Sequence, residues 1–300
     1  MLRTQSILAS STNTLFFGNT FILETHMRVL VLGSHGTIGT SVSKAFLKRG
    51  DEVIPWDIKL SVDHDLRVSG CLDSILPTIN FVVFLAFDVG GAKYMVDSTE
   101  YIDGNLLILH NTFASLKKFS CRFIHSTSTM SNMNHNAYAV LKRVGELYTT
   151  ALGGINLKLW NVYGSEPIGI KSHVIPDLID QAVSGNSIHL RTDGSEKRMF
   201  LHADDFSRGL IAVFENYEEL RCYEVIDISA VEWTSILDVA KIIQSVTMTT
   251  LGKNISIIPS TSANDSHNKQ NQPDMTILSK YWKPTITLED GITSMFPVVV

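Results

Sequence analysis

The sequence has few cysteines and no long apolar run. Its three cysteines, Cys71, Cys121 and Cys222, lie far apart and lack the spacing of metal ligands. This favours free, buried thiols in a reducing, cytoplasmic setting over a disulfide framework, and no metal site is expected. The longest apolar runs, such as residues 81–87, have the length of a strand. A transmembrane helix needs about 20 apolar residues, so no membrane span is predicted.

The sequence also lacks a surplus of basic residues. Lys and Arg number 25 against 30 Asp and Glu, which gives a formal net charge of −5. No general basic field is therefore present to hold nucleic acid or an anionic membrane, and neither is expected as a partner. Any bound phosphate must instead be held by local donors.

The first 26 residues lack a basic segment followed by an unbroken apolar stretch, so a signal peptide is not expected. They are rich in Ser and Thr and almost free of acidic residues. Residues 1–26 are interpreted as a disordered extension before Met27. A weak organelle-targeting segment and a misassigned upstream start are the alternatives.

From residue 28 onward, short β-branched runs alternate with amphipathic segments of helix length. Strands are predicted at 28–33, 52–57, 81–86, 121–126 and 156–162, and helices at 37–50, 98–118, 137–152 and 234–246. This alternation is typical of βαβ units, so the predicted fold is α/β with a doubly wound parallel sheet. After about residue 164 the pattern changes, which indicates a smaller second region. Residues 259–274 are polar and predicted to form a loop.

A glycine-rich turn joins the first predicted strand to the first helix. In "GSHGTIG", Gly33, Gly36 and Gly39 would allow a tight turn, close approach of the backbone to a pyrophosphate, and close helix packing. Asp57 ends the second strand, where a carboxylate can accept hydrogen bonds from ribose hydroxyls. An acid at this place favours NAD over NADP, a preference that the nearby Lys59 weakens. The alternative is a plain strand-to-helix turn with an exposed acid.

A tyrosine and a lysine lie four residues apart at the start of a predicted helix. This spacing places Tyr138 and Lys142 on one helix face, so that the ammonium can favour the phenolate form of the tyrosine. The preceding strand ends in the run "STST" at 126–129, whose hydroxyls could bind the same substrate oxygen. Tyrosine as general base is therefore predicted, against the alternative of an ordinary helix surface.

The ordered segments "GSHGTIG", "STST", "YAVLK", "NVYG" and "RMFLHADDFSRGL" resemble those of the extended short-chain dehydrogenases in the NAD-dependent epimerase/dehydratase family. The resemblance runs from residue 27 almost to the C-terminus. It implies a Rossmann-type NAD-binding domain over 27–165, to which 205–230 returns. It also implies a smaller C-terminal α/β substrate lobe formed by 166–204 and 231–300.

The same resemblance implies particular site residues. Those expected to bind the cofactor NAD are Gly33, Gly36, Thr37, Ile38, Gly39, Asp57, Lys59, Asp65, Leu66, Leu85, Ala86, Asn105, Lys142 and Val162. Those expected to bind substrate are Asn161, His173, Val174 and Arg198, the last through the donor fork of its guanidinium. Plain packing remains open for the segment at 161–164 and for His173, as does a solvated hairpin position for Arg198. Asp205 is expected to brace its segment rather than to react.

The family pattern selects the second hydroxyl of the run as catalytic. Thr127 is therefore expected to act with Tyr138 and Lys142, in preference to Ser126, Ser128 or Thr129. Nucleotide-sugar dehydratases carry an Asp-Glu pair directly after this hydroxyl, whereas this chain has Ser128 and Thr129, so dehydration is disfavoured. GDP-fucose synthases use a histidine at the position of His173, which leaves an acid role for it open.

The predicted function is that of an NAD-dependent nucleotide-sugar epimerase. It would oxidise the C4 hydroxyl of the sugar to a ketone and return the hydride. The alternatives are a 4-dehydrogenase or 4-ketoreductase similar to GDP-fucose synthase, and a non-catalytic NAD-binding sensor. The resemblance implies a nucleotide-diphosphate sugar as partner and a homodimer joined through the helices at 98–118 and 137–152.

Overall fold

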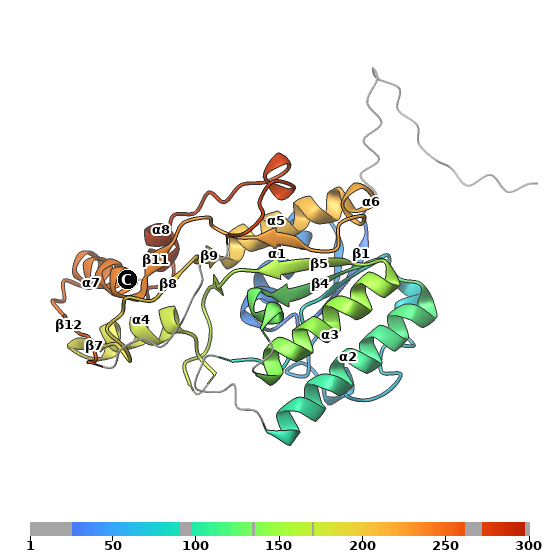
Figure 1. The fold of residues 1–300 in the computed structure, drawn as a ribbon, viewed down its shortest axis with the longest axis horizontal. Coiled ribbons are helices and arrows are strands. Elements are labelled where there is room, and N and C mark those ends of the chain that lie inside the picture. Colours follow the sequence, from blue (N-terminus) through green and yellow to red (C-terminus); the bar gives the residue numbers. More distant parts are fainter. Residues whose placement is uncertain (1–25, 91–97, 134–135, 170, 262–271, 298–300) are drawn as a thin grey trace, which may run out of the picture.

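The centre of the protein is a parallel sheet of six strands. A computed structural model describes residues 26–90, 98–133, 136–169, 171–261 and 272–297, so nearly all of the expected extension lies outside the described residues. The sheet has the order β10-β5-β4-β3-β1-β2 (Figure 1). Its strands are β1 (Arg28–Leu32), β2 (Glu52–Trp56), β3 (Phe81–Phe84), β4 (Phe123–Ser128), β5 (Ile155–Leu159) and β10 (Ile226–Ile228). The order reverses between β1 and β3, and the predicted doubly wound α/β fold is confirmed.

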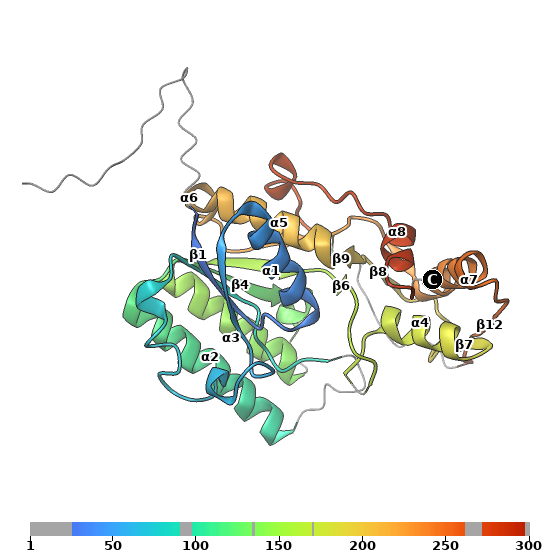
Figure 2. The ribbon, with the colours of Figure 1, turned by 180° about the vertical axis from the view of Figure 1, so that it is seen from behind.

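Helices cover both faces of this sheet. Alternate strand residues point to opposite faces, so Val29 and Val31 pack towards α1 (Thr37–Arg49) and α5 (Ala203–Glu215). Leu30 and Leu32 pack towards α2 (Thr99–Phe119) and α3 (Ala137–Leu152). Figure 1 shows α2 and α3 side by side on one face, and Figure 2 shows α1 in front of the other. The strands are buried on both faces, which accounts for their continuous apolar runs.

A smaller unit with its own apolar core follows the main sheet. Its elements are α4 (Val174–Ser184), β7 (Ser187–His189), α7 (Ile236–Leu251), β12 (Ser256–Ile258) and α8 (Leu288–Thr293). Four further short strands form two pairs: β6 (Val162–Tyr163) pairs with β9 (Leu201–His202), and β8 (Lys197–Arg198) pairs with β11 (Thr234–Ser235). Ile179, Ile188 and Ile243 are buried at the centre of this unit.

The C-terminal part of the chain divides between the two cores. After α5, the short helix α6 (Tyr217–Leu220) leads to β10, which pairs with β5 in the main sheet. Residues 231–300 were expected to lie wholly in the substrate lobe, yet Leu278 and Trp282 pack in the core beside α1 and α5. Asp205 holds this returning segment, because its buried carboxylate accepts hydrogen bonds from the backbone N–H groups of Thr285 and Ile286.

Two strand boundaries differ from the sequence prediction. The strand expected at 156–162 ends at Leu159, and Asn161 adopts a left-handed backbone with φ of 42°. Trp160 leaves the ladder and donates from its indole nitrogen to Asp227 at 2.9 Å. In contrast, β4 extends to Ser128 because its last residues pair with β5. Most of the hydroxyl run therefore lies within the sheet and not in a loop.

The described part of the chain contains no helix that is long and apolar enough to cross a membrane. All three cysteines are free, as predicted. Cys71 and Cys121 are half-buried, whereas Cys222 is exposed and not buried as expected.

Candidate active site

The glycine turn brings the start of α1 against the end of β3. Gly33 has φ of +85°, and a Cβ on it would lie 2.8 Å from the backbone nitrogen of Ala86. A Cβ on Gly39 would lie 2.0 Å from the carbonyl oxygen of Gly33. Both distances are below van der Waals contact, so the tight turn requires glycine at these two positions. Leu85 also bonds to β1, through its N–H and the carbonyl of Leu32, which fixes the segment beneath the turn.

The N-terminus of α1 is suited to an anion. Gly36 is its N-cap and supplies no side-chain hydrogen bond, and the first turn, with Thr37 and Ile38, contains no acidic residue. The leading N–H groups of a helix normally need acceptors, and here no side chain caps them. A pyrophosphate bound there would accept these hydrogen bonds and be favoured by the helix dipole. The turn therefore fits a dinucleotide.

The acid at the end of β2 holds the glycine turn in place. The carboxylate of Asp57 accepts hydrogen bonds from the backbone N–H groups of His35 and Lys59, each at 2.9 Å. Lys59 also binds the turn, because its ammonium donates to the carbonyl oxygen of His35 at 2.9 Å. The structure thus places both residues beside the turn, and their contact with the adenosine ribose stays a prediction.

The other residues expected at the cofactor support this edge of the sheet. Asn105 is fully buried and bonds to both backbone groups of Asp88, so it holds the segment after β3. Leu66 is buried, and its carbonyl oxygen accepts from Asn111. Asp65 forms an ion pair with Arg67 at 2.7 Å, which lowers the pKa of the Asp65 carboxyl. An adenine at Asp65 would therefore meet a carboxylate that already has a partner.

Tyr138 and Lys142 lie together on the first turns of α3. Asn136 directly precedes the helix, and its side chain caps it by accepting from the N–H of Ala139. The Lys142 ammonium lies 5.9 Å from the centre of the Tyr138 ring and donates to the carbonyl oxygen of Ser126 at 3.1 Å. Phe87, which follows β3, places its ring 4.2 Å from the same ammonium. The tyrosine and its cation therefore meet as predicted from their spacing.

Burial changes the proton affinity of both groups. It lowers the pKa of Lys142 to about 7, while the charge of Glu146 acts in the opposite direction. It raises the pKa of Tyr138, and a hydrogen bond with the Ser128 side chain opposes that rise. Ser128 is thus the polar neighbour that favours the phenolate form of Tyr138 against the effect of burial.

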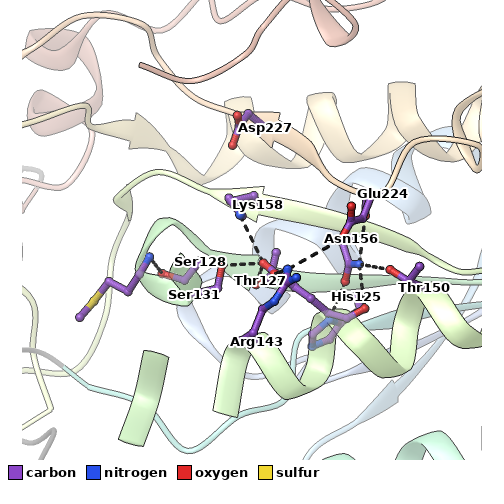
Figure 3. Close-up of polar contacts among 12 residues, drawn as sticks. His125, Thr127, Ser128, Ser131, Arg143, Thr150, Asn156, Lys158, Glu224 and Asp227 are labelled. Carbon is purple, nitrogen blue, oxygen red and sulfur yellow. Dashed lines mark hydrogen bonds and ion pairs between the residues drawn. The ribbon is translucent and has the colours of Figure 1, made fainter. Parts of the chain in front are cut away.

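The hydroxyls of the run in β4 have different partners (Figure 3). Thr127 is buried and donates to the carboxylate of Glu146 at 2.7 Å, because it faces α3. Ser128 ends the strand, accepts from the N–H of Met130 at 3.2 Å, and is the hydroxyl that bonds Tyr138. The expected pairing of Thr127 with Tyr138 is therefore not the one in the structure. The side-chain alternation along β4 gives that place to Ser128.

The residues expected at the substrate lie on the segments that follow β5. Val162 packs against the main core, and the carbonyl oxygen of Asn161 accepts from the N–H of Leu201. Val174 begins α4 and packs on the second core. Arg198 lies in β8, where burial lowers the pKa of its guanidinium and the charge of Glu196 opposes that effect.

An acid that the sequence did not single out joins these segments to the glycine turn. Glu166 accepts from the Thr37 hydroxyl at 3.1 Å and pairs with Nδ1 of His173 at 2.9 Å. Burial raises the pKa of Glu166, but hydrogen bonds from His173 and Thr37 lower it by more. His173 therefore has a carboxylate partner beside the first turn of α1, a neighbour that an isolated loop histidine would lack.

Three further residues of the site escaped sequence reasoning. Glu146 follows Lys142 by four residues, so the helical spacing that connected Tyr138 to Lys142 could have found it. Phe87 and Glu166 carry no such signal, because each reaches the site from a loop. Among the described residues there is no group of three or more His, Cys, Asp or Glu side chains that could hold a metal ion.

Comparison with known proteins identifies the family of this site. The family model described as "NAD dependent epimerase/dehydratase family" matches residues 29–229, so the chain belongs to that family. Membership confirms the predicted NAD-dependent enzyme and argues against the alternative of a non-catalytic sensor.

Individual relatives are distant. The dTDP-4-dehydro-6-deoxy-D-allose reductase of Streptomyces bikiniensis is 24% identical over 73% of this chain and 80% of its own. The structure of epimerase Mth375 from Methanothermobacter thermautotrophicus has a TM-score of 0.77 at 20% identity, covering 89% of this chain and 90% of that one. That of Bordetella bronchiseptica WbmF with NAD⁺ and UDP has a TM-score of 0.75 at 20% identity, covering 90% and 91%. At these identities the structures establish the fold alone.

Proposed function

We propose that this protein is an NAD-dependent nucleotide-sugar epimerase that acts at the C4 hydroxyl of the sugar. The observation that carries the proposal is the arrangement of Tyr138, Lys142 and Ser128 beside the glycine turn. A hydroxyl substrate held there would find a base, a cation and a hydrogen-bond partner together. The free thiols are in keeping with the expected cytoplasmic location.

In this proposal the side chains divide the work on the substrate oxygen. Tyr138, as phenolate, removes the proton from the sugar hydroxyl, and the Lys142 ammonium stabilises the negative charge on the phenolate oxygen. Ser128 donates a hydrogen bond to the same sugar oxygen while the sugar hydroxyl is oxidised to a ketone. We assign this role to Ser128 in place of Thr127, since the Thr127 hydroxyl is bonded to Glu146. NAD, held by the glycine turn and Asp57, would supply the hydride acceptor and donor.

Substrate contacts are proposed for the segments beyond β5. Arg198 would bind the diphosphate, and Asn161 and Val174 would line the sugar side. His173 would contact the sugar with its ring oriented by Glu166. None of these four contacts needs acid-base chemistry beyond Tyr138, so they support an epimerase and a reductase equally.

A 4-ketoreductase is the second candidate. The similarity to a relative named as a 4-dehydro-sugar reductase favours it. The chain's own contribution would be the reverse proton transfer, from Tyr138 to the ketone oxygen. An epimerase keeps its cofactor through the cycle, whereas a reductase consumes one reduced cofactor for each product, so cofactor stoichiometry separates the two.

The experiment is to purify the protein, identify any cofactor that accompanies it, and incubate it with UDP-, GDP-, dTDP- and CDP-sugars. We expect NMR to detect the C4 epimer of one sugar with no net change in absorbance at 340 nm. Net loss of that absorbance with a 4-keto sugar would indicate the reductase instead. An absence of turnover with every sugar and both cofactor states would refute both functions.

We also propose a homodimer joined through α2 and α3. The two helices lie side by side and expose large apolar side chains, among them Leu106 and Leu107 on α2 and Leu147 on α3. Sedimentation is expected to give a dimer, and Leu147→Glu is expected to convert it to monomer because a charge would be buried in the interface. Met248→Glu on α7, which is similarly exposed, is the control expected to leave the dimer intact.

A further inference from the structure

A buried carboxylate lies one helical turn beyond Lys142. The Glu146 side chain is 1% exposed and accepts hydrogen bonds from Ser131 at 2.6 Å, Thr127 at 2.7 Å and Arg143 at 2.8 Å. The Lys158 ammonium on β5 lies 3.4 Å from the same oxygen that the hydroxyls use. Figure 3 shows Thr127, Ser131, Arg143 and Lys158 converging between β4, β5 and α3. None of them has a part in the proton transfer proposed above.

The two hydroxyls on Glu146 flank the turn that carries Ser128. Thr127 precedes Ser128 in β4, and Ser131 lies in the single 3-10 turn Thr129–Asn132 that Ser128 caps. One carboxylate oxygen therefore fixes both ends of this turn to α3. Because Tyr138 lies on α3 as well, the bonds set the position of the Ser128 hydroxyl relative to the tyrosine.

The carboxylate also supplies negative charge beside Lys142. Burial raises the pKa of Glu146, but the hydrogen bonds of Ser131, Arg143 and Thr127 lower it by more, so Glu146 is ionised. Its charge raises the pKa of Lys142 against the effect of burial.

The other groups that face Lys142 carry no negative charge in this state. His125 on β4 is fully buried, and burial together with the Lys142 charge lowers its pKa to about 3, so it is neutral. Phe87, from the loop after β3, presents an apolar ring, and Tyr138 is a phenol whose pKa burial raises. On the far side of Glu146, Arg143 also approaches Glu224 at 3.8 Å, and Lys158 has only 11% of its side chain exposed.

We propose that Glu146 is a positioning residue for the reaction: it fixes the turn that carries Ser128 and provides the counter-charge for the Lys142 ammonium. The proposal rests on the proposed function, because it assigns Glu146 a role through Ser128, Tyr138 and Lys142. A merely structural Glu146 would affect folding but would leave the titration of Lys142 unchanged.

The test separates charge from geometry with two variants. Glu146→Gln keeps the size of the side chain and removes its charge, whereas Ser131→Ala keeps the charge and removes one fixing hydroxyl. The titration of Lys142 is followed by NMR of ¹³C-labelled lysine, with the signal assigned by Lys142→Met. We expect its midpoint to fall by about one pH unit in Glu146→Gln and to stay unchanged in Ser131→Ala. We expect kcat to fall about tenfold in Glu146→Gln and about threefold in Ser131→Ala.

Glu224→Gln is the matched control, because it makes the same chemical change at an exposed partner of Arg143. It is expected to preserve both the Lys142 midpoint and kcat. A Glu146→Gln protein with the wild-type midpoint and wild-type kcat would overturn the proposal. If Glu146→Gln does not fold, the double variant Thr127→Val/Ser131→Ala decides: about tenfold lower kcat supports the positioning role, and wild-type kcat refutes it.

The Lys142 titration requires no substrate, so it remains informative if the wild-type protein turns over no nucleotide sugar. In that case the proposed function fails by itself. A shifted midpoint in Glu146→Gln would still support the counter-charge, and an unshifted midpoint would refute it.

Discussion

Tyr138→Phe is expected to lower kcat by about 10²- to 10⁴-fold with little change in NAD affinity. The substitution keeps the ring, which packs edge-on against Phe87 at 5.6 Å, and removes only the oxygen that would take the substrate proton. Loss of a positioned general base costs catalysis in this range because the barrier to proton transfer rises. Product formation with the nucleotide sugar that the NMR screen identifies gives kcat, and fluorescence titration gives the affinity for NAD.

Tyr148→Phe is the matched control for this prediction. Tyr148 lies on the same helix, stacks on Phe113 at 5.0 Å, and keeps that contact as phenylalanine. The kcat of the Tyr148→Phe variant is expected to equal that of the wild type. If Tyr138→Phe retains more than about a tenth of wild-type kcat, Tyr138 is not the base and the proposed mechanism is wrong.

Ser128→Ala is expected to lower kcat by about a hundredfold, whereas Thr127→Val is expected to lower it by about threefold. Ser128 bonds Tyr138 and would bond the substrate oxygen, so its loss removes a donor where charge develops. Thr127 instead donates to the buried Glu146 at 2.7 Å. Its loss is expected to lower the free energy of unfolding by about 1–3 kcal/mol, because a buried carboxylate loses a hydrogen bond.

The paired measurements for these two variants are kcat and the free energy of urea unfolding. The prediction for Ser128 is a large change in kcat with little change in stability, and that for Thr127 is the reverse. If Thr127→Val loses a hundredfold in kcat while Ser128→Ala keeps nearly all of it, the catalytic hydroxyl is Thr127, as the family pattern indicated.

The contrast between these neighbouring residues shows where sequence reasoning was sufficient. Short continuous apolar runs predicted the strands, since a strand covered on both faces must be apolar throughout. The glycine turn was predictable because the close approach of Gly33 to Ala86 and of Gly39 to Gly33 leaves no room for a side chain. Tyr138 and Lys142 were predictable because helical spacing places them on one face.

Other parts of the site depend on contacts between segments far apart in the chain. Where the strand ends at Leu159 and Asn161 becomes left-handed, Trp160 bonds to Asp227, which lies 67 residues further along the chain. Glu166 meets Thr37 across 129 residues. No local pattern encodes such pairs, so neither the boundary nor the partner of His173 could be predicted.

The sequence by itself determined the doubly wound sheet, the dinucleotide turn and the tyrosine–lysine pair. Each of these follows from local periodicity, steric limits or spacing along one element. Only the tertiary structure decided which hydroxyl meets Tyr138. That choice depends on how far β4 continues beside β5 and on the carboxylate of Glu146, which binds Thr127 on one face and leaves Ser128 at the strand end. Successive side chains of a strand point to opposite faces. A strand that ended one or two residues earlier or later would therefore place a different side chain at the site.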